Sequence, residues 1–428
     1  MYKGVVNMGF YREPMNVNEA IQKVIDHTTL RLPAKTVSLE HAYGRILKEP
    51  IKAKHDVPPF NRSAYDGYAL RAEDTNDATT SNQIIIKVIG TIGAGHVPER
   101  PLQKNEAYRI MTGAILPNDA NAVVMLEHTE EMTDGFALKR PVKMGDCLSF
   151  QGEDAKEGDQ LIPTGTMIHP GTVALLATFG YAEVKVANAP KVSVIATGTE
   201  LLSVSEPLQP GKIRNSNGPM IQAQLKRLGI KANMLGIMAD DLDRATALVE
   251  KALQKSDVVI TTGGVSVGDF DYIPAIYERL GAKVLFNKVK MRPGSVTTVA
   301  QLGDQMLFGL SGNPSACFIG FELFARPSIL TMMGGSSPYL PYMKATLGED
   351  FPQKNNFAKF IRAVWNMTDR GPVVVSAGFN ASSAVSSIAR GNCLIAFPSE
   401  SEGYAKGAEV TILLLGGEQG VGTWEVRL

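Results

Sequence analysis

Segment 190–335 alternates short apolar runs with longer stretches whose apolar residues recur at helical spacing. The predicted strands are KVSVIATG, KANMLGIMADD, DVVITTGG, AKVLFNKVK and QMLFGLSG, and the predicted helices are GPMIQAQLKRLG, LDRATALVEKALQKS, DYIPAIYERLG and SACFIGFELFARPSILTMMGG. Strands that alternate with helices form a mostly parallel sheet with helices on both of its faces. The alternation therefore predicts an α/β domain over this part of the chain.

The chain on either side of this domain follows other patterns. Apolar spacing predicts a helix over 16–31, and SLEHAYGRILKEP and GTVALLATFG are typical of two further helices. Short β-rich runs between glycine turns predict an all-β module between residues 83 and 142, which the strand in YDGYALR precedes. The tail 336–428 returns to short strands, which predict a small β-barrel or sandwich.

Composition narrows the class of protein. The 428 residues include 43 Lys plus Arg and 43 Asp plus Glu, so the formal net charge is zero and nucleic acid is not favoured as a partner. Cys147, Cys317 and Cys393 form no CxxC pair, which disfavours a structural zinc site and fits a reducing compartment. The apolar runs are too short for a signal peptide or a membrane span, so we expect a cytoplasmic protein with no membrane partner.

Glycines and polar residues follow each predicted strand of the α/β domain. In strand order they are Thr197, Gly198, Thr199 and Glu200; Asp240 and Asp241; Gly263, Gly264, Asp269 and Asp271; Arg292, Pro293 and Gly294; and Ser311, Gly312, Asn313 and Pro314. Taken one loop at a time, such residues serve turns and helix caps. However, open α/β sheets bind ligands beyond the carboxyl ends of their strands. Taken together, the five loops therefore predict one cleft.

The residue types in this cleft indicate its chemistry. Carboxylates such as Glu200, Asp240 and Asp271 would repel one another without a cation, and oxygen ligands without His or Cys point to Mg²⁺. Glycine N–H groups and the Arg292 guanidinium provide contacts for an oxyanion. The cleft therefore suits a phosphorylated ligand with a divalent cation. The chain has no GxxxxGK[ST], which disfavours P-loop kinases and ATPases, and no GxGxxG follows the first strand, which disfavours dinucleotide oxidoreductases.

Further candidate residues lie outside the α/β domain. PPFNRSAYDGYA contains Asp66, RIMTGAILP contains Thr112, and QGEDAKEGD contains Asp154. Each of these stretches, taken alone, is typical of a simple turn. In the tail, Arg362 and the serine-rich run 382–387 predict, by themselves, only a solvated strand and a polar loop.

Several of these motifs, in this order and spacing, resemble the MoeA family of molybdopterin molybdenumtransferases, to which a region of animal gephyrin is related. The motifs are PPFNRSAYDGYA, IMTGA, GED, ATGTEL, TTGGVSVGDFDY, RPG and GLSGNP, and the resemblance spans nearly the whole chain. It implies an enzyme that inserts molybdate into adenylylated molybdopterin with Mg²⁺ and releases AMP. It also implies a homodimer, in which the α/β and C-terminal domains of one chain face the N-terminal domains of the other.

The resemblance further implies a multidomain fold of α/β plus β type in four parts. These are a mixed connecting domain (12–57 and 143–188), an inserted β-rich domain (58–142), a Mog-like α/β domain (189–335) and a C-terminal β-barrel (336–428). The α/β domain also resembles stand-alone Mog and MoaB proteins. This likeness suggests a Mog-like adenylyltransferase as a further partner.

Matching positions carry the family's functional residues onto this chain. The catalytic set that the resemblance implies is Asp66, Thr112, Asp154, Glu200, Asp240, Asp271, Lys288 and Arg292. The substrate-binding set is Gly263, Gly264, Ser266, Gly312, Asn313, Pro314, Arg362 and Ser382. Within the first set, Asp240 and Asp271 are expected to hold Mg²⁺, and Glu200 and Asp66 to orient the substrate or water. Three basic side chains are expected to neutralise phosphate or molybdate, namely Lys288, Arg292 and Arg362.

The chain departs from the family pattern at basic and acidic positions. The family's Lys-Pro-Gly-Lys-Pro is Arg-Pro-Gly-Ser-Val at 292–296, so Arg292 keeps one cation and Ser295 replaces the second. Asn61 and Arg62 stand where relatives often carry an acidic group. The changes leave three alternatives open: a paralogue that prefers tungstate, a non-catalytic cofactor-binding or scaffold homologue, and an enzyme of the adenylylation step.

Overall fold

The structure, a computed structural model, describes residues 13–238, 241–264 and 272–416. The chain divides into two compact units. The first comprises Met1–Glu49, Pro163–Ala177 and Tyr181–Leu428, and the second comprises Pro50–Ile162 and Thr178–Gly180. The four domains proposed from the sequence are a finer division and stay a prediction. Among the described residues, no helix is long and apolar enough to cross a membrane.

The main sheet of the first unit is mostly parallel, as the sequence predicted. Its strand order is β16 (Ala232–Met238), β13 (Val192–Thr197), β17 (Val258–Thr262), β21 (Gln305–Leu310), β20 (Thr298–Leu302) and β18 (Lys283–Phe286). The first four strands pair in parallel, whereas β20 is antiparallel to both of its neighbours. The sequence reasoning missed β20, which places the predicted strand β18 at the edge of the sheet.

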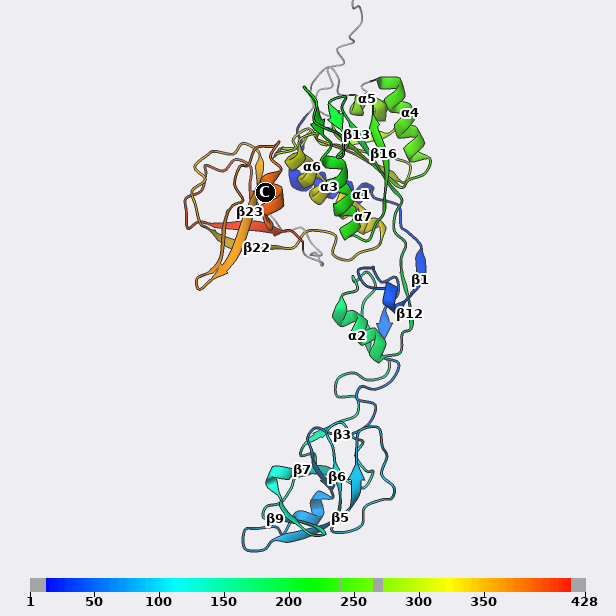
Figure 1. Cartoon of the computed structure of the whole chain (residues 1–428), viewed down its shortest axis with the longest axis vertical. Helices are drawn as coiled ribbons and strands as arrows, with labels where there is room; N and C mark the ends of the chain where they lie inside the picture. The colour runs from blue at the N-terminus through cyan, green and yellow to red at the C-terminus, as the bar shows by residue number, and fades with distance from the viewer. Residues whose placement is uncertain (1–12, 239–240, 265–271, 417–428) are drawn as a thin grey trace, which may run out of the picture. The chain divides into compact units, whose positions relative to one another are not determined.

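Helices cover both faces of this sheet (Figure 1). On one face, Val194, Ile260 and Phe308 share a buried core with α1 (Val17–His27) and α3 (Asn217–Arg227). On the other face, their chain neighbours Ile195, Val259 and Leu307 share a core with α4 (Leu242–Leu253) and α5 (Ile273–Arg279). Successive strand residues point to opposite faces, so these pairs of consecutive apolar side chains require both faces of the sheet to be covered.

The closing helix of the α/β domain is interrupted, although the sequence predicted one continuous helix. It consists of α6 (Pro314–Gly320), a π-helical turn over Phe321–Ala325 and α7 (Arg326–Met332). Pro327 lies in the first turn of α7. Proline has no N–H for the carbonyl four residues earlier and its ring clashes with that carbonyl, so a regular α-helical ladder cannot continue through this position.

The C-terminal strands close into a barrel, which decides between the barrel and the sandwich. The strand order is β23 (Ala358–Thr368), β24 (Gly371–Ser376), β22 (Tyr342–Leu347), β26 (Glu409–Leu414) and β25 (Cys393–Phe397), and β25 pairs again with β23. A short strand from the α/β domain, β19 (Met291–Arg292), adds to this barrel in parallel with β23. This pairing joins the barrel to the α/β domain through the backbone.

The second unit is built on a β-sheet, as the β-rich sequence predicted (Figure 1). Its strand order is β7 (Ala122–Met125), β4 (Gly67–Leu70), β6 (Glu106–Ile110), β5 (Ile84–Ile92), β9 (Gly135–Leu138) and β8 (Glu130–Met132). Strand β4 is the one predicted in YDGYALR. At its start, a Cβ on Gly67 would lie 2.1 Å from the carbonyl oxygen of Val124, so the neighbouring strand leaves room only for glycine.

One predicted helix, over residues 38–50 and almost entirely in the first unit, does not form. SLEHAYGRILKEP forms only a 3₁₀ turn over Leu39–His41, and its buried Ile46 and Leu47 form β-bridges with Met167 and Val186. Gly44, with φ of 72°, turns the chain out of the helical path. By contrast, the first predicted helix is α1, and the third is α2 (Pro170–Thr178).

Candidate functional site

The strand order of the α/β sheet places a crevice between β13 and β17. From β13 the chain crosses through α3 to β16 on one side, and β17 then pairs with β13 on the other side. Such a reversal leaves a gap between neighbouring loops at the carboxyl edge of the sheet, where open α/β sheets bind ligands. Two cavities of the described residues open at this edge.

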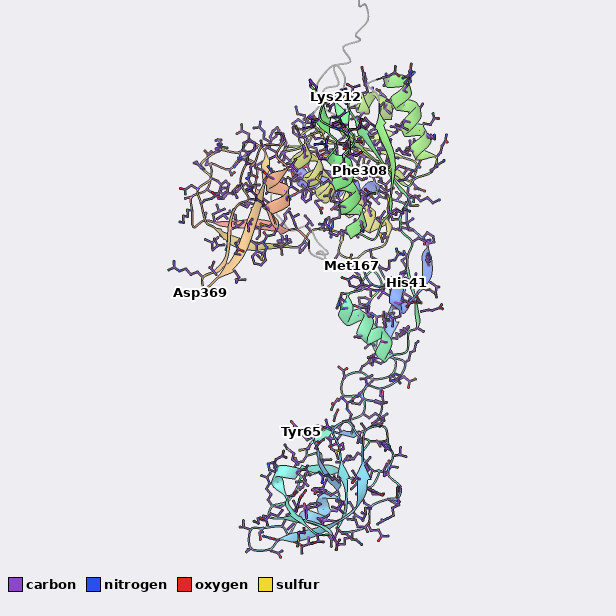
Figure 2. All side chains as sticks on the ribbon, viewed as in Figure 1. His41, Tyr65, Met167, Lys212, Phe308 and Asp369 are labelled. Carbon is purple, nitrogen blue, oxygen red and sulfur yellow. The ribbon has the colours of Figure 1, made fainter. Side chains whose placement is uncertain are left out.

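The first cavity, called here the glutamate cavity, has a volume of about 460 Å³. The ends of three parallel strands contribute to its wall through Thr197, Thr262 and Gly312, and Glu200 provides a carboxylate. The loop that carries Glu200 is closed by Lys212, labelled in Figure 2, whose Nζ donates to the carbonyl oxygen of Thr199. The polar lining is completed by Asn215, Asn217 and Asn313.

Glycines permit close backbone contacts at the floor of this crevice. Gly263 has φ of 91°, and a Cβ there would lie 2.5 Å from Oγ1 of Thr197. The Thr197 hydroxyl in turn donates to the carbonyl oxygen of Thr262 at 2.8 Å. Gly264 also has a positive φ, of 67°. The predicted glycine pair therefore brings the ends of β13 and β17 into direct contact.

The sequence reasoning missed Asn217, which stands at the start of α3. The residue is only 7% exposed, and its Nδ2 donates to the carbonyl oxygen of Gly312 at 2.8 Å. Its Oδ1 is buried and has no hydrogen-bond partner among the described residues. An unpaired buried acceptor is costly, and Asn217 belongs to the lining of the glutamate cavity, so this oxygen is a candidate contact for a ligand there. In the sequence, an asparagine at a helix start signals only a cap.

The second cavity, called here the arginine cavity, has a volume of about 360 Å³ and lies between the α/β domain and the barrel. The α/β domain contributes Arg292, Gly294 and Ser295, and the barrel contributes Lys359 and Ser382. Among the described residues, the lining of this cavity includes no carboxylate side chain. Two cations without an acid in the lining make the arginine cavity attractive to an anion.

Lys359 is a second residue that the sequence reasoning missed. It belongs to β23 and is only partly exposed. Burial, and then the neighbouring positive charge of Arg292, lower the pKa of Lys359. The Arg292 guanidinium lies 5.6 Å from the centre of the Phe357 ring. In the sequence, a lysine in an alternating strand indicates only a solvated face.

Asn313 lines both cavities, so the two share a wall. The barrel loop after β24 also reaches both, through Ser382 in the arginine cavity and Ser383 in the glutamate cavity. Pro314 joins the glutamate cavity alone. A single extended ligand could therefore occupy both cavities.

Arg362, predicted as a substrate-binding residue, is fully buried beneath this loop. Its Nη2 donates to the carbonyl oxygen of Ala381 at 2.9 Å and its Nε to Oγ of Ser387 at 3.3 Å. Burial lowers the pKa of Arg362 to about 10, which still leaves it charged at neutral pH. Its Nη1 has no hydrogen-bond partner among the described residues. Arg362 thus holds the serine loop in place and keeps one donor free.

Lys288 is not brought to either cavity. It lies in the loop before β19 and is absent from the lining of the two described cavities. Its carbonyl oxygen accepts a hydrogen bond from the N–H of Met15 at 3.0 Å. Arg292 is part of the described lining of the arginine cavity, whereas the role of Lys288 stays a prediction.

Three other predicted residues lie in the second unit. Asp66 follows Tyr65, which is labelled in Figure 2 and is half exposed. Oδ1 of Asp66 accepts hydrogen bonds from the N–H of Thr112 at 2.7 Å and from its hydroxyl at 2.8 Å. These bonds, the backbone one first, lower the pKa of Asp66. The structure thus brings Asp66 and Thr112 together, as one exposed and ionised site.

Asp154 is exposed, and its backbone N–H donates to the carbonyl oxygen of Val57 at 3.0 Å. The adjacent turn is fastened to the PPFNRSAYDGYA loop by Asn61, whose Oδ1 accepts from the N–H of Gln151 at 2.8 Å. Asn61, a departure from the family pattern, therefore has a structural contact of its own. It ties together the two loops that carry Asp66 and Asp154.

Asp240, Ser266 and Asp271 lie outside the described residues. Within the parts of the chain that are described, no group of three or more His, Cys, Asp and Glu side chains could hold a metal ion. The assignment of Mg²⁺ to Asp240 and Asp271 therefore stays a prediction.

Comparison with known families places three matches along the chain. A family model described as the MoeA N-terminal region (domain I and II) matches residues 15–180. A second, described as a probable molybdopterin binding domain, matches residues 193–331, and a third, the MoeA C-terminal region (domain IV), matches residues 344–415.

Individual proteins match over almost the full length. The chain is 50% identical over 403 residues to the molybdopterin molybdenumtransferase of Staphylococcus aureus (strain COL). This match covers 94% of this chain and 96% of the relative. It is 48% identical over 403 residues to the protein of that name from Staphylococcus epidermidis, again over 94% of this chain and 96% of the relative. Among solved structures, the molybdopterin biosynthesis moeA protein from Pyrococcus horikoshii OT3 is 32% identical with a TM-score of 0.81, over 94% of this chain and 100% of that chain.

Proposed function

The chain belongs to the MoeA family of molybdopterin molybdenumtransferases, and on this premise we propose that it inserts molybdate into adenylylated molybdopterin and releases AMP. Relatives that share this transferase name over 94% of the chain favour an active enzyme of molybdenum cofactor biosynthesis over a non-catalytic scaffold. In the proposed reaction, the two dithiolene sulfurs displace two oxygens of molybdate, which leave as water with the two thiol protons and two protons from solvent. A water molecule breaks the phosphoanhydride bond that links AMP to the terminal phosphate of molybdopterin.

One observation carries the proposal, namely the two cavities that share Asn313 as a common wall. The substrates bring a phosphate link and a tetrahedral oxyanion to one place. The glutamate cavity offers the carboxylate of Glu200 to a cation that binds the phosphate end. The arginine cavity offers positive charge for the oxyanion through Arg292. An oxyanion is stabilised most by donors that are already in place.

The residues of the glutamate cavity fit a Mg²⁺ ion held jointly with the substrate. Mg²⁺ prefers oxygen ligands and keeps several waters, binding through one or two carboxylates plus substrate phosphates. The cavity supplies the Glu200 carboxylate and the unpaired amide oxygen Oδ1 of Asn217. When bound, the ion would neutralise negative charge on the phosphates as AMP leaves. Glu200 and Asn217 are therefore proposed to contact the ion, together with any carboxylate outside the described residues.

The sulfur chemistry belongs to the substrate in this proposal. Cys317 and Cys393 are fully buried, and burial raises the pKa of both thiols well above the ordinary value, so neither is a nucleophile at neutral pH. The molybdopterin dithiolene provides both sulfurs that bind molybdenum. The chain's own residues bind and orient the substrates. Arg292 attracts the oxyanion, and Arg362 holds in place the loop that carries Ser382.

We further propose that the active form is a homodimer. Asp66, Thr112 and Asp154 belong to a different compact unit from the two cavities. A second copy of the chain can supply such a unit to complete a site, since closed two-fold dimers are the commonest assemblies.

A cytoplasmic setting is also proposed, because Cys147, Cys317 and Cys393 are all unpaired in the structure. The adenylylated substrate would come from a separate adenylyltransferase.

The decisive experiment incubates the purified protein with adenylylated molybdopterin, Mg²⁺ and molybdate, and measures AMP. The expected result is AMP release that requires molybdate and accompanies the formation of molybdenum cofactor. AMP release that does not depend on molybdate would rule out the proposed transferase function. Formation of pyrophosphate from ATP and molybdopterin would instead assign the preceding adenylylation step to this chain.

A further inference from the structure

The arginine cavity takes its positive charge from two different domains. Its lining contains the cationic side chains of Arg292, which follows the α/β sheet, and of Lys359, which belongs to the barrel. In the sequence, the motif around Arg292 lacks a second cation because position 295 is serine. The structure shows that Ser295 lines the same cavity as Lys359. The cavity therefore holds two cations although the motif itself supplies one.

Backbone pairing brings these two cations together. Strands β19 and β23 run in parallel, with Met291 opposite Ala358 and Arg292 opposite Lys359. The N–H of Ala358 donates to the carbonyl oxygen of Lys290 at 3.0 Å and holds this register. Residues opposite each other in paired strands project to the same face. The neighbouring position of two like charges is thus built into the strand register.

Neither cation has a charged partner among the described residues. Arg292 faces the Phe357 ring, and Nζ of Lys359 donates to the uncharged Oε1 of Gln353 at 3.1 Å. No ion pair of the described residues includes Arg292 or Lys359, whereas Lys344 and Lys354 of the same barrel both pair with glutamates. Two adjacent like charges in a partly buried place disfavour each other unless an anion joins them.

We infer that Lys359 binds the same tetrahedral oxyanion as Arg292 and supplies the second positive charge of the site. The inference rests on the proposed function, since the oxyanion is either molybdate or the substrate phosphate. Gly294, with φ of 93° and a Cβ position 2.7 Å from the Met291 side chain, keeps the turn beside these two cations narrow. Lys359 is thus a substrate-binding residue that the family motifs do not mark.

The test compares Lys359→Met and Lys359→Arg with wild type in the molybdate-dependent AMP assay, with molybdate and adenylylated molybdopterin varied separately. We expect Lys359→Met to raise one KM by about tenfold, equivalent to ~1.4 kcal/mol, with little change in kcat. A raised KM for molybdate identifies the anion as molybdate, and a raised KM for the pterin identifies it as phosphate. Lys359→Arg should restore most of the affinity.

Two control variants separate anion binding from a structural role. Gln353→Ala removes the one described hydrogen-bond acceptor of the Lys359 ammonium, and Lys344→Met removes a barrel lysine that pairs with Glu409 outside the cavity. Both should keep wild-type KM values. Unchanged KM values in Lys359→Met, or an equal rise in Gln353→Ala, would overturn the inference.

Direct anion binding distinguishes failure of this inference from failure of the proposed function. If wild type releases no molybdate-dependent AMP, the transferase proposal fails, and molybdate binding is then measured by calorimetry. Weaker molybdate or diphosphate binding by Lys359→Met than by wild type would still support the inference. Equal binding of both anions by the two proteins would contradict it.

Discussion

Oδ1 of Asp66 accepts both hydrogen bonds that Thr112 can donate, from its N–H at 2.7 Å and from its hydroxyl at 2.8 Å. Both bonds favour the ionised carboxylate, so the pKa of Asp66 lies below its ordinary value. The negative charge is present at neutral pH and is lost only as pH falls through this lowered pKa. The pair is therefore a site on the second unit that is already negatively charged at neutral pH, with its carboxylate held by two hydrogen bonds.

Substitution of Thr112 by Val should make this site sensitive to acid. The change keeps the backbone donor and removes the hydroxyl donor, so the pKa of Asp66 rises toward its ordinary value. The acidic limb of the kcat/KM profile should then move to higher pH, which a rate series from pH 4 to 8 would detect. Thr79→Val, whose hydroxyl bonds to Asn82 in an exposed turn, is the matched control and should leave the profile in place. If the acidic limb of the profile does not move in Thr112→Val, the reaction does not require Asp66 in its ionised form.

Mixing of two inactive variants should restore activity if the site is shared between two copies. Asp66→Asn damages one compact unit and Arg292→Ala the other, so a mixed dimer contains one intact site. After unfolding and refolding together, an equal mixture should recover about a quarter of wild-type activity, because half of the dimers are mixed and each has one working site of two. Activity no higher than the separate variants would contradict the shared site.

Glu200→Gln should weaken the dependence on Mg²⁺. The amide keeps the shape of the side chain but removes the negative charge from the glutamate cavity. The Mg²⁺ concentration for half-maximal rate should rise by about tenfold, equivalent to ~1.4 kcal/mol. Glu206→Gln is a suitable control, because its carboxylate accepts from the N–H of Ser203 and is absent from the cavity lining. An equal shift in both variants would exclude a specific role for Glu200.

Gly263→Ala should cost more stability than Gly303→Ala, although both glycines have positive φ. A Cβ at Gly263 would lie 2.5 Å from Oγ1 of Thr197, whereas a Cβ at Gly303 would meet nothing within 4 Å. We expect ~1–3 kcal/mol of backbone strain at each site, with the steric clash added only at Gly263. Urea unfolding of the two variants measures the difference. Equal losses would show that the Thr197 contact relaxes without cost.

The buried Glu322 should be essential for stability. Its Oε1 accepts from Nε2 of Gln224 at 2.8 Å and from Nη2 of Arg227 at 2.6 Å, and Nε of Arg326 lies 3.9 Å from Oε2. Glu322→Leu would leave the buried Arg326 without its carboxylate, and such losses cost ~3–5 kcal/mol. Glu402→Leu, which breaks an exposed pair with Lys354, should cost about 1 kcal/mol or less. Similar midpoints in thermal unfolding of the two variants would contradict this assignment.

The sequence predicted those features of the fold that depend on local periodicity. Apolar residues at successive positions, Val194 and Ile195 in β13 and Val259 and Ile260 in β17, required helices on both faces of the sheet. The residues at the carboxyl edge lie together because the two strands are parallel. Barrel closure was left open against a sandwich, because it depends on the distant pairing of Ile361 with Ile395. The helix predicted over 38–50 was wrong, because Gly44 turns the chain and buried Ile46 and Leu47 form bridges instead.

The candidate site was predicted in part for the same reason. Thr197, Gly263 and Asn313 follow strands that neighbour one another, so their proximity could be inferred from topology. Lys359 and Asn217 could not be found this way. Lys359 reaches the arginine cavity through the pairing of β19 with β23, and Asn217 reaches the glutamate cavity through a contact with Gly312. Both contacts join segments far apart in the sequence and leave no local pattern.

The pairing of β19 with β23 has a mechanical consequence for the arginine cavity. A hinge between the barrel and the α/β domain would have to break the bond from the N–H of Ala358 to the carbonyl oxygen of Lys290, which spans both domains. The spacing between the backbones of Arg292 and Lys359 is consequently fixed by the strand register. If these two residues bind an oxyanion as proposed, they can do so without a closing motion of the two domains.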